Sequence, residues 1–186
     1  MIATAQGPAV VIGVGNVLLR DDGVGVRMVE ELRRVAERDA SALPEGTHLL
    51  DGGTLGLDLL GAVEGARSLL LLDAVDLDQP AGTVSVLRGD AITDAAAGVG
   101  PGRRIARGVE ELLAVARLTG RLPDPVSLVG IQVDDTNLGE GLSERVAAAL
   151  PRAVELARVE LYELDGLVEA AAPRTAGTGE AEGVTA

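Results

Sequence analysis

The sequence predicts an α/β fold: a three-layer sandwich with a mostly parallel five-stranded sheet and helices on both faces. Strand-like and helix-like segments alternate along the chain, which favours a parallel sheet covered by helices. The first strand, expected at 10–14, is an apolar run without polar alternation, as in strands buried on both faces. Apolar residues make up 47% of the 186 residues and aromatic residues only 1%, so aliphatic side chains must fill the core.

The first strand leads through a glycine-containing loop into a helix, and two acids, Asp21 and Asp22, stand at the start of that helix. One carboxylate could be the helix N-cap, because it would accept orphan backbone N–H groups and complement the helix dipole. One acid satisfies that need, so the second is a candidate functional group. The apolar face of the helix, at three-to-four spacing, consists of Val24, Met28, Leu32 and Val35.

The glycines of this loop suggest an alternative function. Gly13 and Gly15 match the first two glycines of the dinucleotide-binding pattern, but Leu18 occupies the third glycine position. A nucleotide- or nucleoside-binding domain is therefore retained as one hypothesis.

The later elements follow from apolar runs separated by breakers. A Pro80–Gly82 turn is too short for a crossover helix, so the strand after it should run antiparallel to the preceding strand or be joined to it by a compact loop. The polar segment 90–102 is expected to be a surface loop. The remaining strands are expected at 47–50, 68–72, 83–87 and 126–131, and the remaining helices at 55–66, 105–118 and 143–164.

Three residues mark the expected helix ends. Gly120 is a C-cap for the helix at 105–118, and Ser143 is an N-cap for the last helix. Pro151 should kink or divide that last helix. Residues 1–168 are expected to form a single domain, and the breaker-rich residues 169–186 a disordered tail.

Composition excludes several function classes. The net charge of −13 disfavours binding to nucleic acid or to an anionic membrane. The chain has no Lys and no Cys, so Schiff-base chemistry, a Walker lysine and a thiolate nucleophile are excluded. The N-terminus does not resemble a signal peptide, and no apolar run approaches the ~20 residues of a membrane span. We expect a soluble, cytoplasmic protein.

Acidic residues follow four of the five predicted strands. The carboxyl ends of parallel strands meet at one edge of a sheet, where ligands bind in open α/β folds. Like charges crowded there are costly unless a cation joins them, which favours a metal site. The acids are Asp21 and Asp22, Asp51, Asp73 and Asp76, and Asp134 and Asp135.

Several linked motifs occur in order along the chain. The longest are GVGNVLLRDDGVG (13–25), DGGTLGLDLLG (51–61) and LLLDAVD (70–76). Shorter ones are PAGTV (80–84), ARLTG (116–120), LVGIQ (128–132) and LGEGLS (138–143). From Val10 to Leu164, in order and with matching spacing, these motifs resemble those of the hydrogenase maturation proteases. The resemblance implies an α/β sandwich around a five-stranded sheet. It also implies an endopeptidase, aspartic-type by family, that removes the C-terminal extension of the [NiFe]-hydrogenase large-subunit precursor after nickel insertion.

The resemblance also implies site residues. Asp22 and Asp73 correspond to the family's acids that recognise nickel, and they would be both metal-contacting and catalytic. The family's third ligand, a histidine, corresponds to Ile105, so this chain lacks it. Asp51, Asp76 or Asp134 could complete the site, or the precursor could carry the nickel with ligands of its own. The expected substrate loop consists of Asn16, Asp51, Gly52, Gly53 and Thr54, with the Gly52 and Gly53 N–H groups as candidate oxyanion donors.

His48, the only histidine, is not a good substitute for the missing ligand. It lies three residues before Asp51, about 10 Å from the strand end at ~3.3 Å per residue, and on the opposite face. We expect it to be a partly buried strand histidine.

The missing histidine leaves a second function open: a non-cleaving family member that binds a hydrogenase precursor as a maturation chaperone or regulator. In either case the expected partner is the [NiFe]-hydrogenase large-subunit precursor, and the expected oligomeric state is a monomer.

Overall fold

A computed structural model describes residues 7–96, 103–105 and 107–171. The strands are β1 (Ala9–Val14), β2 (Thr47–Gly53), β3 (Ser68–Leu77), β4 (Val84–Arg88), β5 (Arg103–Arg104) and β6 (Val126–Gln132). The α-helices are α1 (Val24–Arg38), α2 (Leu60–Val63), α3 (Asp90–Ala96), α4 (Arg107–Leu118) and α5 (Glu144–Ala171). Single 3-10 turns are η1 (Arg20–Gly23), η2 (Ala40–Ala42) and η3 (Gly56–Leu59).

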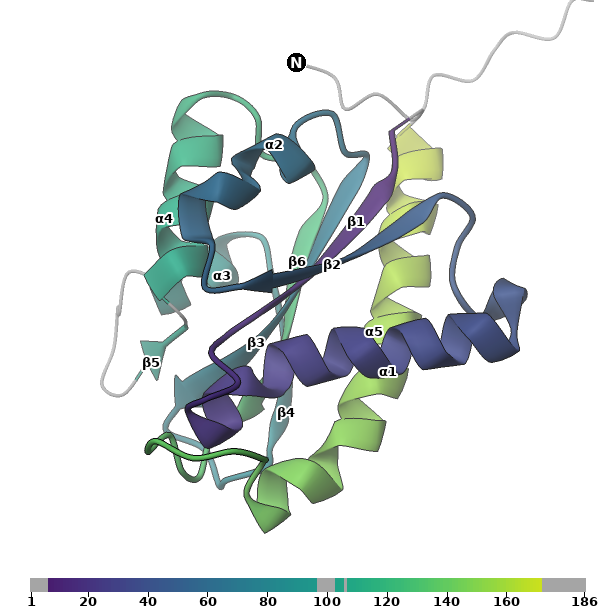
Figure 1. Ribbon diagram of the computed structural model, residues 1–186. Helices are drawn as coiled ribbons and strands as arrows, with labels where there is room; N and C mark the ends of the chain where they lie inside the picture. Colours follow the sequence, from purple (N-terminus) through teal and green to yellow (C-terminus); the bar gives the residue numbers. More distant parts are fainter. Residues whose placement is uncertain (1–6, 97–102, 106, 172–186) are drawn as a thin grey trace, which may run out of the picture.

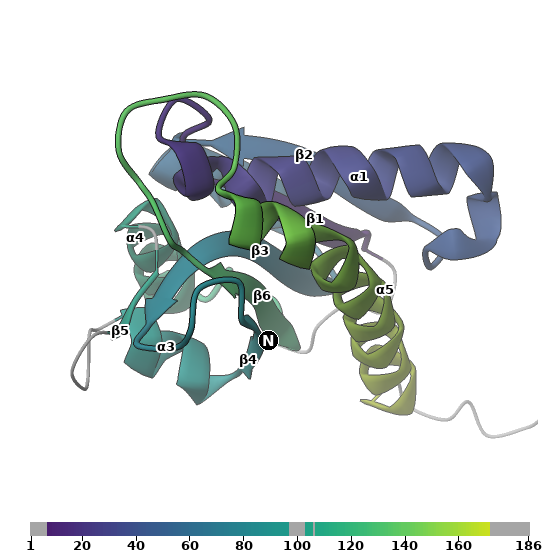
Figure 2. The same ribbon diagram turned by 90° about the horizontal axis from the view of Figure 1, so that it is seen from below.

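The main sheet has five strands in the order β2-β1-β3-β6-β4, and the short β5 pairs with β3 beyond them. All pairings in the main sheet are parallel except that of β4 with β6. Helices α1 and α5 cover one face of the sheet, and α2, α3 and α4 cover the other (Figures 1 and 2). The predicted three-layer, mostly parallel fold is confirmed. Strand β4 also runs opposite to β3, as expected, but β6 lies between them.

The side-chain alternation of the strands builds two separate cores. In β3, Leu70 and Leu72 pack under α1 and α5, whereas Leu69 and Leu71 pack under α2, α3 and α4. Both sets are fully buried, which explains why the strand reads as an uninterrupted leucine run. Aliphatic side chains fill both cores, as the composition requires.

Strand β3 is longer than predicted. The sequence places its end at Leu72, but pairing with β6 continues through Val75↔Gln132, and β5 pairs with Asp76 and Leu77. Asp73 therefore lies inside a strand rather than at the start of a loop. Its neighbour β1 pairs with β3 only as far as Gly13↔Leu72, so Asp73 stands where β1 ends.

Two predictions in the segment 90–118, one of a loop and one of a helix start, are corrected. The segment expected to be a loop from 90 forms α3, because Ile92 and Ala95 share one helix face and are buried in the core. Residues 97–102 lie outside the described part of the chain. Helix α4 begins at Arg107, so Ile105 precedes the helix. Gly120 does follow α4 as expected, with φ of 67° and its N–H donating to Arg117 C=O.

The ends of the other helices differ somewhat from the predicted ends. The helix expected at 55–66 is η3 followed by α2, and it ends at Val63. Helix α5 is one helix through Pro151, not two, although its ribbon changes direction in its first half (Figure 1). It continues to Ala171, past the expected domain boundary at residue 168; residues 172–186 of the expected tail lie outside the described residues.

His48 is exposed rather than partly buried, because β2 is the edge strand of the sheet. Within the described part of the chain, no helix combines the length and the apolar character needed to cross a bilayer.

Candidate functional site

Asp21 is a structural residue, buried completely between two loops. Its carboxylate accepts four hydrogen bonds from the segment between β6 and α5. The N–H groups of Asp134 and Asp135 donate to Oδ2 at 2.9 and 2.8 Å. Ser143 donates its N–H to Oδ1 at 2.6 Å and its hydroxyl to Oδ2 at 2.8 Å. A buried carboxylate with this many donors fixes the positions of both loops.

Neither Asp21 nor Asp22 is the N-cap of α1, so the alternative that one of them caps this helix is wrong. The residue before α1 is Gly23, and no side chain caps that helix end. The expected cap Ser143 does precede α5 directly, but its hydroxyl donates to Asp21.

Backbone hydrogen bonds extend the contact between the loops that follow β1 and β6. Arg20 N–H donates to Gly139 C=O at 3.0 Å, and Gly139 N–H donates to Leu18 C=O at 2.9 Å. Both views show these loops side by side (Figures 1 and 2). Arg20 also forms an ion pair with Asp135 at 3.3 Å. The pKa of Asp135 lies below its usual value, chiefly because the Asn137 N–H bonds its carboxylate, with help from the Asn137 amide and Arg20.

Asp22 closes the loop after β1. Its Oδ2 accepts the N–H of Asn16 at 2.8 Å, and Asn16 Oδ1 accepts the N–H of Leu18 at 3.0 Å. Asp22 is half-buried, whereas Asp21 is completely buried. The chain turns tightly here: Gly15 has φ of 130°, and a Cβ on it would lie 1.8 Å from Asp22 C=O. Asp22 is therefore the acid of the pair that remains accessible.

Asp73 is completely buried in β3, opposite Gly130 of β6. Its Oδ1 accepts the N–H of Ala74 at 2.8 Å. Strand alternation places its side chain on the sheet face covered by α2, α3 and α4, like that of Val75.

The two aspartates lie at the same end of the sheet. Helix α1 crosses this end so closely that a Cβ on Gly25 would lie 2.2 Å from Leu72 C=O and 2.4 Å from Val14 C=O. Asp22 precedes Gly25 by three residues, and Asp73 follows Leu72 directly. The close packing of α1 also accounts for Gly13 of the nucleotide-binding pattern, because a Cβ on it would lie 2.2 Å from Gly25 C=O.

The expected substrate loop adjoins this end of the sheet. Gly15 N–H donates to Gly53 C=O at 2.9 Å, which joins the loops after β1 and β2. Asp51 is exposed, and its Oδ1 accepts the Gly53 N–H at 3.0 Å. That N–H is already engaged, so the structure does not support Gly53 as an oxyanion donor.

Ile105, at the position of the family histidine, is 9% exposed and packs in the core with Val75 and Leu69. The preceding residue, Arg104, lies opposite Asp76 in the antiparallel backbone pairing of β5 with β3. An apolar side chain thus fills the place that the resemblance assigns to a metal ligand, on the sheet face to which Asp73 points.

The predicted crowding of acids at the strand ends is not found. Among residues 7–96, 103–105 and 107–171, no group of three or more His, Cys, Asp or Glu side chains could hold a metal ion. Asp134 pairs with Arg145 at 3.2 Å, and Asp135 pairs with Arg20. Asp76 accepts a hydrogen bond from the Gln132 amide at 3.0 Å. The acids are neutralised or bonded separately.

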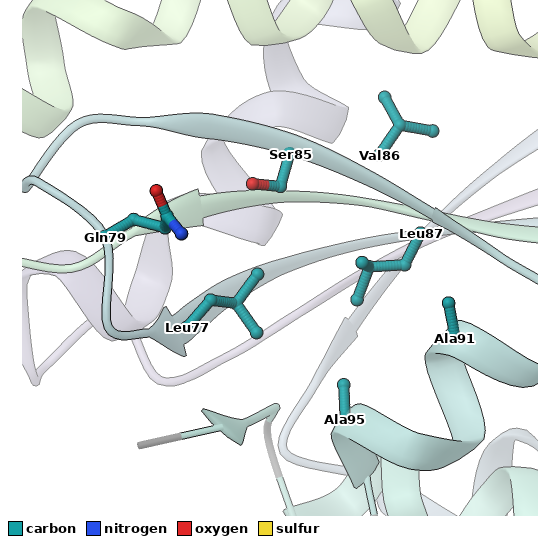
Figure 3. A pocket seen from close by; sticks show the side chains of 7 residues that line it. All are labelled: Leu77, Gln79, Ser85, Val86, Leu87, Ala91 and Ala95. Atoms are coloured by element: carbon teal, nitrogen blue, oxygen red, sulfur yellow. The ribbon is translucent and has the colours of Figure 1, made fainter. Parts of the chain in front are cut away.

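A pocket of about 400 Å³ lies between the edge strand β4 and α3 (Figure 3). Its lining is mostly small and apolar, and neither Asp22 nor Asp73 takes part in it. The lining residues are Leu77, Gln79, Ser85, Val86, Leu87, Ala91 and Ala95.

The chain is similar to known hydrogenase maturation proteins over most of its length. A family model described as hydrogenase maturation protease matches residues 26–160. Hydrogenase expression/formation protein HoxM of Cupriavidus necator is 35% identical over 177 residues, which cover 95% of this chain and 83% of HoxM. Hydrogenase 2 maturation protease of Escherichia coli is 32% identical over 154 residues, which cover 82% of this chain and 90% of that protein.

Solved structures agree with the sequence relatives. The hydrogenase maturating endopeptidase HybD from Escherichia coli superposes with a TM-score of 0.71 at 31% identity, covering 84% of this chain and 93% of HybD. The maturation protease HybD from Thermococcus kodakarensis gives 0.65 at 26% identity, covering 83% and 99%. The chain therefore belongs to the hydrogenase maturation protease family.

Proposed function

We propose that this protein is the endopeptidase that removes the C-terminal extension of an [NiFe]-hydrogenase large-subunit precursor after nickel insertion. Membership of a family whose solved members include a hydrogenase maturating endopeptidase supports the reaction class. The observation that supports Asp22 and Asp73 as the site is the close packing of α1 on Leu72. Asp22 lies just before this helix, and Asp73 follows Leu72 in β3, so the packing places both residues at the same end of the sheet.

Asp22 and Asp73 would contact the nickel ion that the precursor carries. Two carboxylates do not make a complete metal site, and among the described residues no third His, Cys, Asp or Glu side chain forms a metal-binding group with them. An ion that arrives with ligands from the precursor does not require one. Nickel is thus part of the substrate in this proposal, rather than a resident cofactor.

Contact with the ion would position the scissile peptide bond, which is a large part of what an enzyme must achieve. A water molecule activated by a carboxylate or by the ion would then hydrolyse the bond. Asn16 holds Asp22 through its N–H, and the exposed residues Asp51, near the end of β2, and Thr54, directly after it, would contact the extension.

The test is incubation of the purified protein with nickel-loaded precursor, followed by mass spectrometry of the large subunit. The proposal predicts a shortened large subunit with the wild-type protein, and none with Asp22→Asn or Asp73→Asn. Asp94→Asn, at an exposed position on α3, is the matched control and should leave processing unchanged. No shortening by the wild-type protein would overturn the proposal.

A second function is favoured by one observation: Ile105 is packed in the core at the family's histidine position. A member without that ligand could bind the precursor as a maturation chaperone without cleaving it. A stable complex with an unshortened precursor in the same experiment would identify this function. We expect either function to be carried out by a cytoplasmic monomer that binds neither nucleic acid nor membrane, in keeping with the net charge of −13.

A further inference from the structure

Exposed apolar side chains gather on the loops that follow the carboxyl ends of β1, β2 and β6. Among the described residues, nine large apolar side chains are exposed, and five of them lie on these loops. The other four lie on α4 and α5. The five, here called the apolar rim, are Val17, Leu18, Leu55, Leu57 and Leu138.

Leu18 and Leu138 form a pair within the apolar rim. Leu19 and Gly139 are joined by a parallel β-bridge, and Gly139 N–H donates to Leu18 C=O at 2.9 Å. The two leucines each precede a bridged residue, so their side chains leave the bridge on the same side. They are 56% and 81% exposed. Two neighbouring leucines in water are a costly arrangement unless something covers them.

This pair is held rigidly. The loop after β1 is fastened to the loop after β6 by the four hydrogen bonds to the buried carboxylate of Asp21. A surface that is ordered before binding loses little conformational entropy when a partner docks. The rim also adjoins the proposed site, because Leu18 and Asp22 belong to the same loop, which Asp22 closes through Asn16.

Three exposed carboxylates lie on the segments that carry the rim: Asp51 near the end of β2, Asp58 in η3 and Glu140 in the loop after β6. None of them takes part in an ion pair among residues 7–96, 103–105 and 107–171. A partner segment that is apolar and positively charged would complement this surface in both respects.

We propose that the apolar rim is the docking surface for the precursor segment next to the scissile bond, a segment with leucine-sized apolar side chains and at least one cationic side chain. This inference rests on the proposed function for the identity of the partner. Leu18 and Leu138 are the central contacts, and they act in binding rather than in the chemical step.

The experiment compares the double variant Leu18→Ser/Leu138→Ser with Leu118→Ser and with the wild type. Leu118 is a matched control, because it is 87% exposed at the end of α4, before the chain returns to the amino end of β6. The measurements are the Kd for purified nickel-loaded precursor by calorimetry, KM and kcat for processing, and the unfolding midpoint.

The proposal predicts that the double variant raises both Kd and KM by about tenfold or more, because two leucine contacts with the precursor are lost. It also predicts an unchanged kcat and unfolding midpoint, a wild-type response for Leu118→Ser, and weaker binding at high salt. Equal affinity of the double variant and the wild type would overturn it, as would an equal loss with Leu118→Ser. Calorimetry separates the two proposals: binding without cleavage overturns the proposed protease function but leaves the docking surface testable through Kd.

Discussion

Asp21 and Ser143 stand 122 positions apart in the chain, yet two hydrogen bonds join them, from the Ser143 N–H at 2.6 Å and from its hydroxyl at 2.8 Å. With the N–H groups of Asp134 and Asp135, they surround a carboxylate that has no exposure to solvent. This contact fixes the loop that carries Asp22 against the segment that leads into α5.

Asp21→Asn should destabilise the protein by about 3 kcal/mol, because an amide cannot accept all four hydrogen bonds and its NH₂ group would face donors. Ser143→Ala should cost about 1 kcal/mol, since it removes only the hydroxyl bond. The measurement is the free energy of unfolding in urea. A cost below 1 kcal/mol for Asp21→Asn would show that the loops are held by other contacts.

Asp22→Asn and Asp73→Asn should each abolish processing of the precursor and change the free energy of unfolding by no more than about 1 kcal/mol. Groups kept for function contribute little to stability, and their replacement is often neutral for folding. Mass spectrometry of the large subunit and urea unfolding of the same preparations check both parts. If both variants unfold, these acids are structural partners instead.

Ile105→His should restore a response to nickel in this site, because imidazole is a better nickel ligand than carboxylate alone. It should also lower the free energy of unfolding by about 2 kcal/mol, since a polar ring replaces an apolar side chain in the core. Calorimetry with Ni²⁺ measures the first effect. Ile92→His, elsewhere in the same core, is the control. Equal nickel binding by both variants would contradict a role for position 105.

The environment of Glu160 leads us to expect a loss of protein stability at acidic pH. Burial alone would raise its pKa, but hydrogen bonds from Arg88 and Ser127, together with the charge of Arg88, lower the pKa below the usual value. Arg88 Nε and Ser127 Oγ donate to Glu160 at 2.7 and 2.6 Å. The unfolded state therefore takes up this proton first, and the stabilisation is complete above the unfolded pKa of about 4.3.

Stability should accordingly fall as the pH drops below about 4.3 and through the lower folded pKa. Glu160→Gln should cost about 2 kcal/mol at neutral pH and flatten this part of the curve. Urea unfolding between about pH 3 and pH 7 checks both. An identical pH slope in the variant would show that other carboxylates cause the acid loss.

The sequence predicted the three layers, the mostly parallel direction of the strands, and the end of the sheet at which the acids lie, but not the order of the strands. Leucine runs, glycine breakers and helix periodicity are local signals, and each of them is read from neighbouring residues. The predicted end of β3 is too early because aspartate is a poor strand residue. Pairing with β6, whose Gly130 is more than fifty residues away from Asp73 in the chain, continues the strand through this position.

The local sequence pattern could not separate the roles of Asp21 and Asp22, and only the motif resemblance indicated Asp22 as the site residue. Both acids stand at the same helix start, and their difference depends on donors from Asp134, Asp135 and Ser143, which are remote in the chain. Ile105 is similar: motif spacing identifies the position, but only the fold shows that its side chain fills the core.

Anomalous X-ray scattering from crystals soaked in Cd²⁺ tests most directly whether Asp22 and Asp73 act on a single ion. The soaked ion stands in for the nickel that the precursor carries. Our account predicts one anomalous peak to which both carboxylates are ligands. Two separate peaks, one at each aspartate, or a peak that only one of them contacts, would contradict it.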